Sequence, residues 1–169
     1  MTTGTRTVDS AWAAGYAVFV LLIIAALATF DIIMRRVPNK ALLFFCAVAL
    51  AAPAVYALDP NSSVFSWSTA LRLLLPALSG AAVGFTVLLA AAIASKGGNG
   101  VGGGDIKLAA VLGFVYGPAG IITILLAASL LALPTGLIYK LRTGGKILRL
   151  PFVPFIALGC LIVTFARLT

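Results

Sequence analysis

Four aspartates are the only acidic residues in this chain of 169 residues, which contains neither glutamate nor histidine. This inventory excludes histidine-based catalytic triads and carboxylate pairs that contain glutamate. The two cysteines, Cys46 and Cys160, lie in apolar runs without CxxC spacing, so neither a metal site nor a disulfide framework is predicted. Acid–base chemistry in this chain must therefore use aspartates. They are Asp9, Asp31, Asp59 and Asp105.

Asp105 directly follows a glycine-rich stretch, in which six of the eight residues from Gly97 to Gly104 are glycine. Residues 98–103 match the pattern GxGxxG, but a dinucleotide site also needs a preceding strand and a βαβ unit, whereas a long apolar run comes before this stretch. Two interpretations remain. The stretch is a flexible connector between helices, or it is a loop without side chains that admits a substrate backbone and water to Asp105.

The composition is that of a membrane protein, because 62% of the residues are hydrophobic and only 9% are charged, with a mean hydropathy of +1.17. A membrane-spanning helix needs roughly 20 apolar residues. We therefore predict an all-α, polytopic membrane protein, a bundle of six transmembrane helices that forms a single domain over residues 1–169. The predicted segments are 12–30, 41–58, 70–95, 106–117, 119–139 and 151–168, and the fourth of them ends at the Gly117-Pro118 break.

The basic residues predict the orientation of the bundle. Nine of the twelve lysines and arginines fall in the loops after the first, third and fifth segments, which the positive-inside rule assigns to the cytoplasm. Both termini are then external. The net charge of +8 is explained by retention beside anionic lipid, and nucleic-acid binding is not predicted. A signal peptide cleaved near Ala28 is the alternative for the first segment, and it is disfavoured by the Arg35-Arg36 pair that follows.

This topology places two of the four aspartates on the cytoplasmic side, Asp31 at the end of the first segment and Asp105 at the start of the fourth. Carboxylates within a bilayer are costly and usually mark a functional pathway. Two that lie close together share one proton at neutral pH. Such a pair can carry out aspartic proteolysis, in which the ionised carboxylate activates water and its protonated partner polarises the scissile carbonyl.

Residues next to the two aspartates have competing interpretations. Arg35 lies four residues after Asp31 and could contact it on a continuing helix, although headgroup anchoring is the simpler interpretation. Asn39, just after Pro38, could N-cap the second helix, with a substrate-facing amide as the alternative. Lys107 lies on a different helix face from Asp105, and we interpret it as a cytoplasmic anchor that could also tune the pair.

Two pairs of glycines have the spacing that allows helices to pack closely in membranes. Gly80 and Gly84 lie in the third segment, and Gly113 and Gly117 lie in and after the fourth. Close packing explains all four without any chemistry.

Three motifs follow from the residues around the two aspartates and near the C-terminus. Gly102-Gly103-Gly104-Asp105 is a GxGD motif, followed by Ile106-Lys107-Leu108. Asp31 is followed by Val37-Pro38-Asn39, and residues 151–159 read PFVPFIALG. Together these motifs resemble the prepilin peptidases, in which Ile/Val-Pro-Asn/Asp follows the first aspartate and the last motif is PFGPFLALG, from which this chain departs at Val153.

The resemblance implies an aspartic endopeptidase with Asp31 and Asp105 as its catalytic pair. Residues that support the loop or the substrate would be Gly102, Gly103, Gly104, Lys107, Pro38 and Asn39. The enzyme would need no metal or organic cofactor. Its partners would be the lipid bilayer and a prepilin or pseudopilin, whose basic leader it would remove at the cytoplasmic face of the bacterial inner membrane.

The small size resembles the peptidases of tight-adherence (Flp-type) pilus systems, and archaeal preflagellin peptidases are also small. Larger family members also N-methylate the new terminus and carry a cytoplasmic insert with paired cysteines. This chain has neither feature, which makes methyl transfer doubtful.

Two other functions use the same residues differently. A proton- or cation-coupled transporter would employ the aspartate pair as a relay, but it predicts polar residues along the whole span, and the centres of these segments are almost wholly apolar. A non-catalytic subunit of a pilus or secretion assembly would need neither aspartate.

Overall fold

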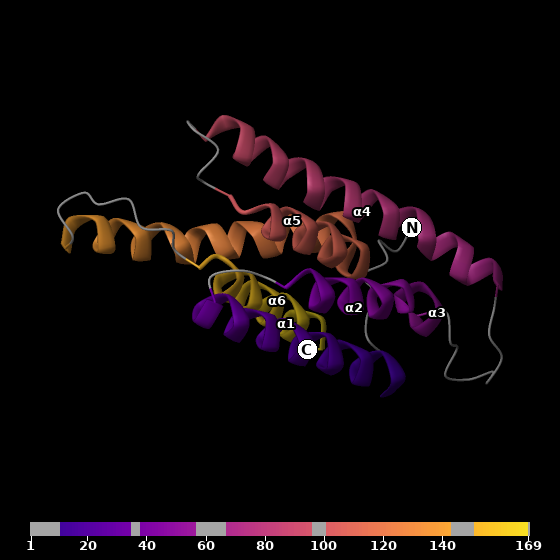
Figure 1. The fold of residues 1–169 in the computed structure, drawn as a ribbon. Helices are drawn as coiled ribbons and strands as arrows, with labels where there is room; N and C mark the ends of the chain where they lie inside the picture. Colours follow the sequence, from indigo (N-terminus) through magenta and orange to yellow (C-terminus); the bar gives the residue numbers. More distant parts are fainter. Residues whose placement is uncertain (1–10, 35–37, 57–66, 96–100, 143–150, 169) are drawn as a thin grey trace.

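The computed structural model describes residues 11–34, 38–56, 67–95, 101–142 and 151–168, and every regular element in these ranges is a helix (Figure 1). The elements are α1 (Ala11–Met34), α2 (Asn39–Leu50), α3 (Ala52–Tyr56), α4 (Trp67–Ala94), α5 (Gly103–Arg142) and α6 (Val153–Leu168). The predicted all-helical fold class is therefore confirmed for the described residues.

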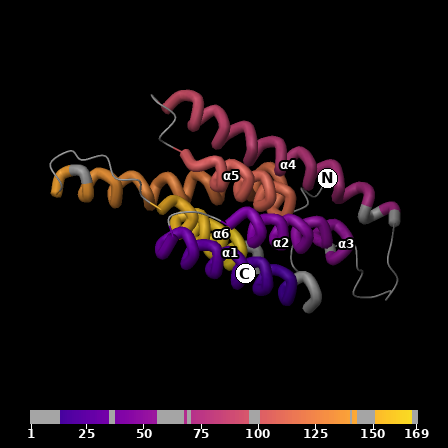
Figure 2. Tube along the Cα trace, viewed as in Figure 1, coloured from indigo at the N-terminus to yellow at the C-terminus, as the bar shows by residue number. Residues whose placement is uncertain are grey.

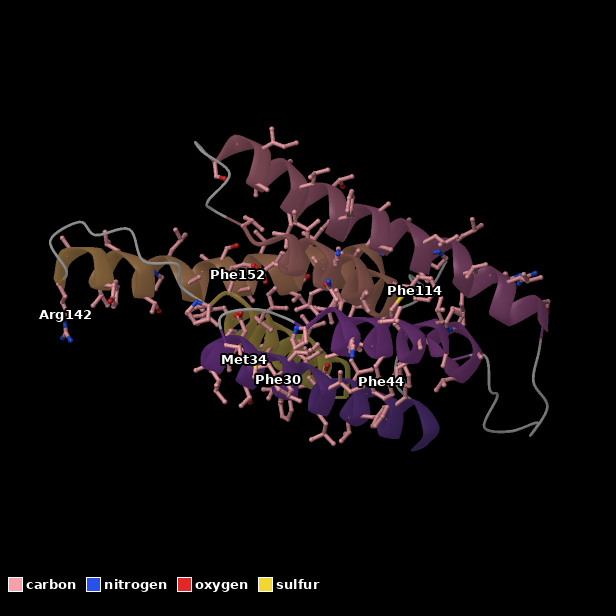
Figure 3. The ribbon with its side chains drawn as sticks, viewed as in Figure 1. Phe30, Met34, Phe44, Phe114, Arg142 and Phe152 are labelled. Carbon is pink, nitrogen blue, oxygen red and sulfur yellow. The ribbon has the colours of Figure 1, made fainter. Side chains whose placement is uncertain are left out.

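Within the part of the chain that the structure describes, three helices are long and apolar enough to cross a bilayer. Their apolar parts are Ala14–Met34, Leu71–Ala94 and Gly103–Tyr139, whereas Asn39–Val55 and Val153–Ala166 are apolar but shorter. Large apolar side chains such as Phe30, Met34 and Phe44 are exposed on the outside of α1 and α2, as expected where lipid is the solvent (Figure 3). Membrane-protein character is confirmed, and six crossings stay a prediction.

The second predicted segment, 41–58, is interrupted in the structure. α2 ends at Leu50 and the short α3 begins at Ala52. Pro53 explains the break, because proline has no N–H to continue the helical ladder and its ring clashes with the preceding turn.

α5 consists of two parts that meet at Gly117, whose backbone has φ 71° and ψ 177°. Glycine adopts this positive φ without steric cost, and Pro118 then restarts the helix with its fixed φ. A Cβ atom built on Gly84 would contact both the Ala109 carbonyl and the Ile121 side chain. In a straight helix, residues 109 and 121 would be about 18 Å apart and could not both reach one atom. The chain therefore doubles back at the predicted Gly117-Pro118 break (Figure 2).

Glycines bring α4 into contact with the backbone of α5. A Cβ atom on Gly80 would collide with the Gly113 carbonyl oxygen, and one on Gly113 would collide with that of Gly80. A Cβ on Gly80 would also come within 2.7 Å of Gly117, and one on Gly84 would collide with the Ala109 backbone. The close helix packing predicted from the pairs Gly80/Gly84 and Gly113/Gly117 is therefore confirmed.

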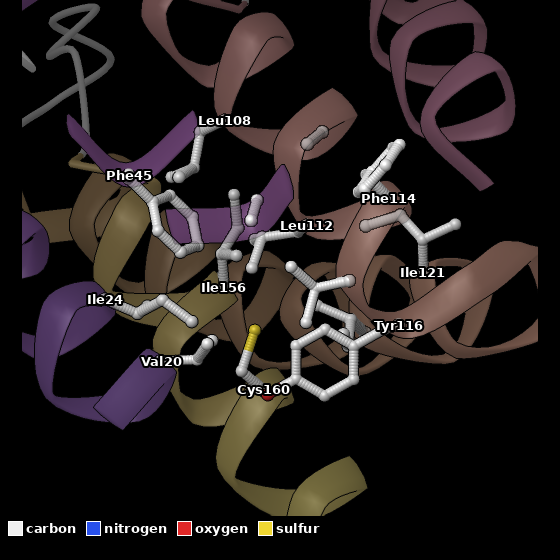
Figure 4. Close-up of a cluster of buried hydrophobic side chains, with 14 of the residues drawn as sticks. Val20, Ile24, Phe45, Leu108, Leu112, Phe114, Tyr116, Ile121, Ile156 and Cys160 are labelled. Carbon is white, nitrogen blue, oxygen red and sulfur yellow. The ribbon is translucent and has the colours of Figure 1, made fainter. Parts of the chain in front are cut away.

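The core forms where α1, α2 and α6 gather around α5 (Figure 4). Its central side chains are Val20 and Ile24 of α1, Phe45 of α2, Leu108 and Leu112 of α5, and Ile156 and Cys160 of α6. The C-terminal end of α1 and the N-terminal ends of α5 and α6 lie at one end of this bundle (Figure 1).

Candidate active site

Asp31 occupies a core position of α1. It is 7% exposed and continues the buried stripe of Val20, Ile24 and Leu27, whose spacing follows the helical period. α1 extends to Met34, so Asp31 lies inside the helix and not at its end as the sequence predicted. Its Oδ2 atom accepts a hydrogen bond of 3.3 Å from the backbone N–H of Val153, the first residue of α6. The sequence pattern thus places a carboxyl group where an apolar side chain would normally pack.

Asp105 is held by its own helix start. It is the third residue of α5, and its Oδ2 accepts a hydrogen bond of 3.3 Å from the Gly102 N–H. The Asp105 N–H in turn donates to the Gly102 carbonyl at 3.0 Å. The bond from the Gly102 N–H to the Asp105 side chain is one half of a capping box, whereas the second bond goes to the Gly102 backbone carbonyl because glycine has no side chain. The N-terminal end of a helix also favours a negative charge. The local sequence thereby fixes the direction of this carboxylate.

Asp31 lies near the C-terminal end of α1 and Asp105 lies in the first turn of α5, and these two helix ends are at the same end of the bundle, although 74 positions separate the residues in the chain. The two carboxyl groups are near enough to interact electrostatically. Asp31 is buried and Asp105 is half-buried, so bulk water screens their interaction only partly. Two carboxyl groups arranged in this way can share one proton, which is the chemical requirement for activating water with one and polarising a carbonyl with the other.

The glycines before Asp105 differ in the space around them. A Cβ on Gly102 would lie 3.3 Å from Oδ2 of Asp105, whereas one on Gly103 would meet nothing within 4 Å. Gly104 is half-buried. Open space therefore lies beside the loop within two residues of the acid. Residues 96–100, which contain the rest of the glycine-rich stretch, lie outside the described residues.

The residues predicted around the pair are only partly placed as expected. The N-cap of α2 is Pro38, with φ −63° and ψ 126°, and its carbonyl accepts the Leu42 N–H at 3.1 Å. The expectation that Asn39 N-caps this helix is wrong, because the extended backbone of Pro38 already occupies that position and Asn39 is the first helical residue. Asn39 and Lys107 are exposed, and Arg35 lies outside the described residues.

Val153 is the site residue that the sequence did not identify. It attracted notice only as a departure from a motif, yet its buried backbone N–H is a partner of Asp31. The sequence signal that could have identified Val153 is its place at the start of a predicted helix, because the first N–H groups of a helix lack intrahelical acceptors and are free to bind another group. Within the described ranges, no three side chains of the metal-ligating types gather into a cluster.

Residues 16–137 match the type IV leader peptidase family, and the chain belongs to that family. It is 39% identical over 150 residues to a protein of Bacillus subtilis (strain 168) named prepilin leader peptidase/N-methyltransferase, an alignment that covers 86% of this chain and 52% of the relative. A Xanthomonas campestris pv. campestris protein with the same name is 38% identical over 94 residues, 53% of this chain and 33% of the relative.

The chain thus spans about half the length of the Bacillus relative and a third of the Xanthomonas one. No solved structure matches it significantly. The family assignment agrees with the resemblance seen in the three sequence motifs.

Proposed function

We propose that this chain is an aspartic endopeptidase that cleaves the basic leader of prepilin-like precursors, with Asp31 and Asp105 as its catalytic residues. The observation that carries the proposal is that the C-terminal part of α1, which carries Asp31, and the N-terminal start of α5, which carries Asp105, lie at one end of the bundle, with the two carboxyl groups near enough to interact electrostatically. Family membership and the printed names of the relatives support the substrate class. The proposal covers leader cleavage and not methyl transfer.

In the proposed reaction, the ionised carboxylate of the pair takes a proton from a water molecule as that water attacks the scissile carbonyl. The protonated partner donates a hydrogen bond to the carbonyl oxygen, and a tetrahedral intermediate forms between them. Return of a proton to the amide nitrogen then lets the C–N bond break and the amine leave. No covalent intermediate with the enzyme forms, and the pair ends with the single proton that it held at the start.

The loop before Asp105 offers a path for the substrate backbone. The free space beside Gly103 can accept an extended peptide, and Gly102 keeps side-chain atoms away from the Asp105 carboxylate. Peptide at membrane depth must unwind before it can be cleaved, and unwound backbone is tolerated only where protein or water satisfies its polar groups. The apolar helix of the precursor would then lie in lipid beside the bundle.

We further propose the topology that the charges favour: one membrane-embedded domain with six crossings, external termini and the aspartate pair at the cytoplasmic face of the inner membrane. Support comes from the positive-inside rule, since nine of the twelve cations fall in alternate loops. The doubling back of α5 at Gly117 supports a topology in which its two parts cross the membrane separately.

A transporter that uses the same pair is not favoured. Such a relay needs polar groups along the span, and among the described residues the buried polar groups are the side chains of Asp31 and Thr164 and the hydroxyl of Tyr116. Thr164 is itself hydrogen-bonded to the Tyr116 hydroxyl at 2.8 Å. The polar groups therefore form no continuous pathway through the described part of the bundle.

The test is co-expression of a candidate prepilin with the wild type, D31N, D105N and the matched control D59N, scored by precursor size on a gel. Asparagine keeps the shape of aspartate and removes its titrating carboxyl group. We expect D31N and D105N each to abolish processing at unchanged membrane levels, and D59N to process normally. Normal cleavage by D31N or by D105N would contradict the shared pair.

A further inference from the structure

The backbone N–H of Val153 and the Oδ2 atom of Asp31 form a buried hydrogen bond of 3.3 Å between residues that are 122 positions apart. Val153 is 0% exposed and Asp31 is 7% exposed, so water cannot replace either partner freely. α6 thus provides the group that holds the carboxylate of α1.

The first turn of α6 leaves this N–H as its available donor. The N–H groups of Phe155 and Ile156 donate to the Phe152 carbonyl at 3.1 and 3.2 Å, and Pro154 has no N–H. Val153 therefore presents the remaining N–H of this turn, and Asp31 accepts it. The N-terminal end of the 16-residue α6 also carries a partial positive charge, which favours a carboxylate at this point.

The side chain of Val153 keeps its N–H in place. It is fully buried in the core beside Ile156 of the same helix, so the start of α6 is anchored against the bundle. Met34, three residues after Asp31 in α1, and Phe152, the residue just before α6, lie at the same end of the bundle (Figure 3). The helix start is thus a fixed support for Asp31.

We propose that Val153 is a positioning residue for the leader-peptidase reaction: its backbone N–H fixes the Asp31 carboxylate in the orientation that serves the pair with Asp105. The role of Val153 in the reaction rests on the proposed function. The position of the Asp31 carboxylate rests on the hydrogen bond from Val153. The side chain does not touch the reacting atoms, and the group that acts is in the main chain.

Only a substitution that changes the backbone can remove this donor. V153P deletes the N–H, and proline is well suited to the first position of a helix. V153A and V153G keep the N–H and lose most or all of the side chain, so they control for packing. All three variants are made in the full chain, purified in detergent micelles and assayed with a synthetic prepilin peptide that contains the leader and the apolar helix.

We expect the kcat of V153P to fall roughly ten- to hundredfold below that of V153A, with KM within about threefold, because a hydrogen bond to a charged group is lost from the pair. V153G is expected to follow V153A. Equal kcat values for V153P and V153A would overturn the proposal, as would an equal loss in V153P, V153A and V153G. A rise in KM at constant kcat would move the role from positioning to substrate binding and would also overturn it.

A second readout does not depend on cleavage. In the infrared spectrum, the Asp31 carboxyl band is identified by its absence in D31N, and we expect V153P, but not V153A, to shift it. An unshifted band in V153P would contradict the contact. If the wild type cleaves no prepilin, the proposed function fails, and the infrared comparison still decides whether Val153 holds Asp31.

Discussion

The carbonyl oxygen of Gly113 occupies the space that a side chain on Gly80 would need, and the Gly80 carbonyl does the same to Gly113. Backbone meets backbone at this crossing of α4 and α5, so neither position can accept a methyl group without moving a helix. Because Asp105 lies in the first turn of α5, this crossing supports the position of the helix that carries one carboxyl group of the candidate site.

G113A is expected to destabilise the bundle by about 1–3 kcal/mol, because overpacking forces a rigid backbone apart. The measurement is thermal unfolding in detergent. G15A is the matched control, since Gly15 is exposed in α1 and a Cβ there would meet nothing within 4 Å. Equal melting temperatures for G113A and G15A would show that the crossing is looser than the structure indicates.

G117A is expected to cost roughly 1–2 kcal/mol for a different reason, the placement of a Cβ atom at a positive φ. The nearest atom to a Cβ at this position is the Pro76 carbonyl oxygen at 3.9 Å, so crowding contributes little. G117N should lose about as much stability as G117A, because at φ 71° and ψ 177° the backbone lies in a region that is essentially restricted to glycine, where asparagine has no advantage over alanine. Melting curves of the two variants test this, and a G117A as stable as the wild type would argue against backbone strain at this position.

G103A is expected to leave stability unchanged and to raise KM severalfold for a prepilin peptide, if the open space beside Gly103 receives the substrate backbone. The two readouts separate the roles, because a purely structural glycine would change the melting temperature. An unaltered KM would remove Gly103 from the proposed substrate path.

The proposed pair predicts a bell-shaped dependence of cleavage on pH. Only the form with one proton on the two carboxyl groups can both activate water and polarise the carbonyl, so the rate should fall when both are protonated and when both are ionised. The measurement is kcat/KM for a synthetic prepilin across the pH range in which the wild type stays folded. A rate that depends on a single ionisation would not fit a shared proton.

The buried hydrogen bond between Tyr116 and Thr164 links α5 to α6. A double-mutant cycle with Y116F and T164V should give a coupling of about 0.5–1.5 kcal/mol, the range for hydrogen bonds between membrane helices. T29V is the control, because the exposed Thr29 hydroxyl bonds only to the Ala25 carbonyl of its own helix. A coupling near zero would mean that this bond does not hold the two helices together.

Much of this protein follows from local features of its sequence. Long apolar runs predict helices in a membrane whatever their neighbours, because the bilayer requires internal hydrogen bonding. The Gly117-Pro118 pair predicts a break, and the spacing of Gly80 and Gly84 predicts close packing, since both depend on side-chain size and backbone freedom. The shortage of acidic residues singles out Asp31 and Asp105 as the candidates for chemistry before any contact is known.

Only the tertiary structure decided which residues of different helices contact each other and which residue caps α2. The capping role expected of Asn39 belongs to Pro38, because the backbone one residue earlier takes the extended conformation. The hydrogen bond from Val153 to Asp31 depends on how far α1 is displaced along α6, and no local pattern encodes that displacement. Side-chain types and spacing determine elements and candidate residues. The hydrogen bond across 122 positions and the proximity of Asp31 to Asp105 arise only when whole helices pack, because many buried side chains settle the alignment of the helices together.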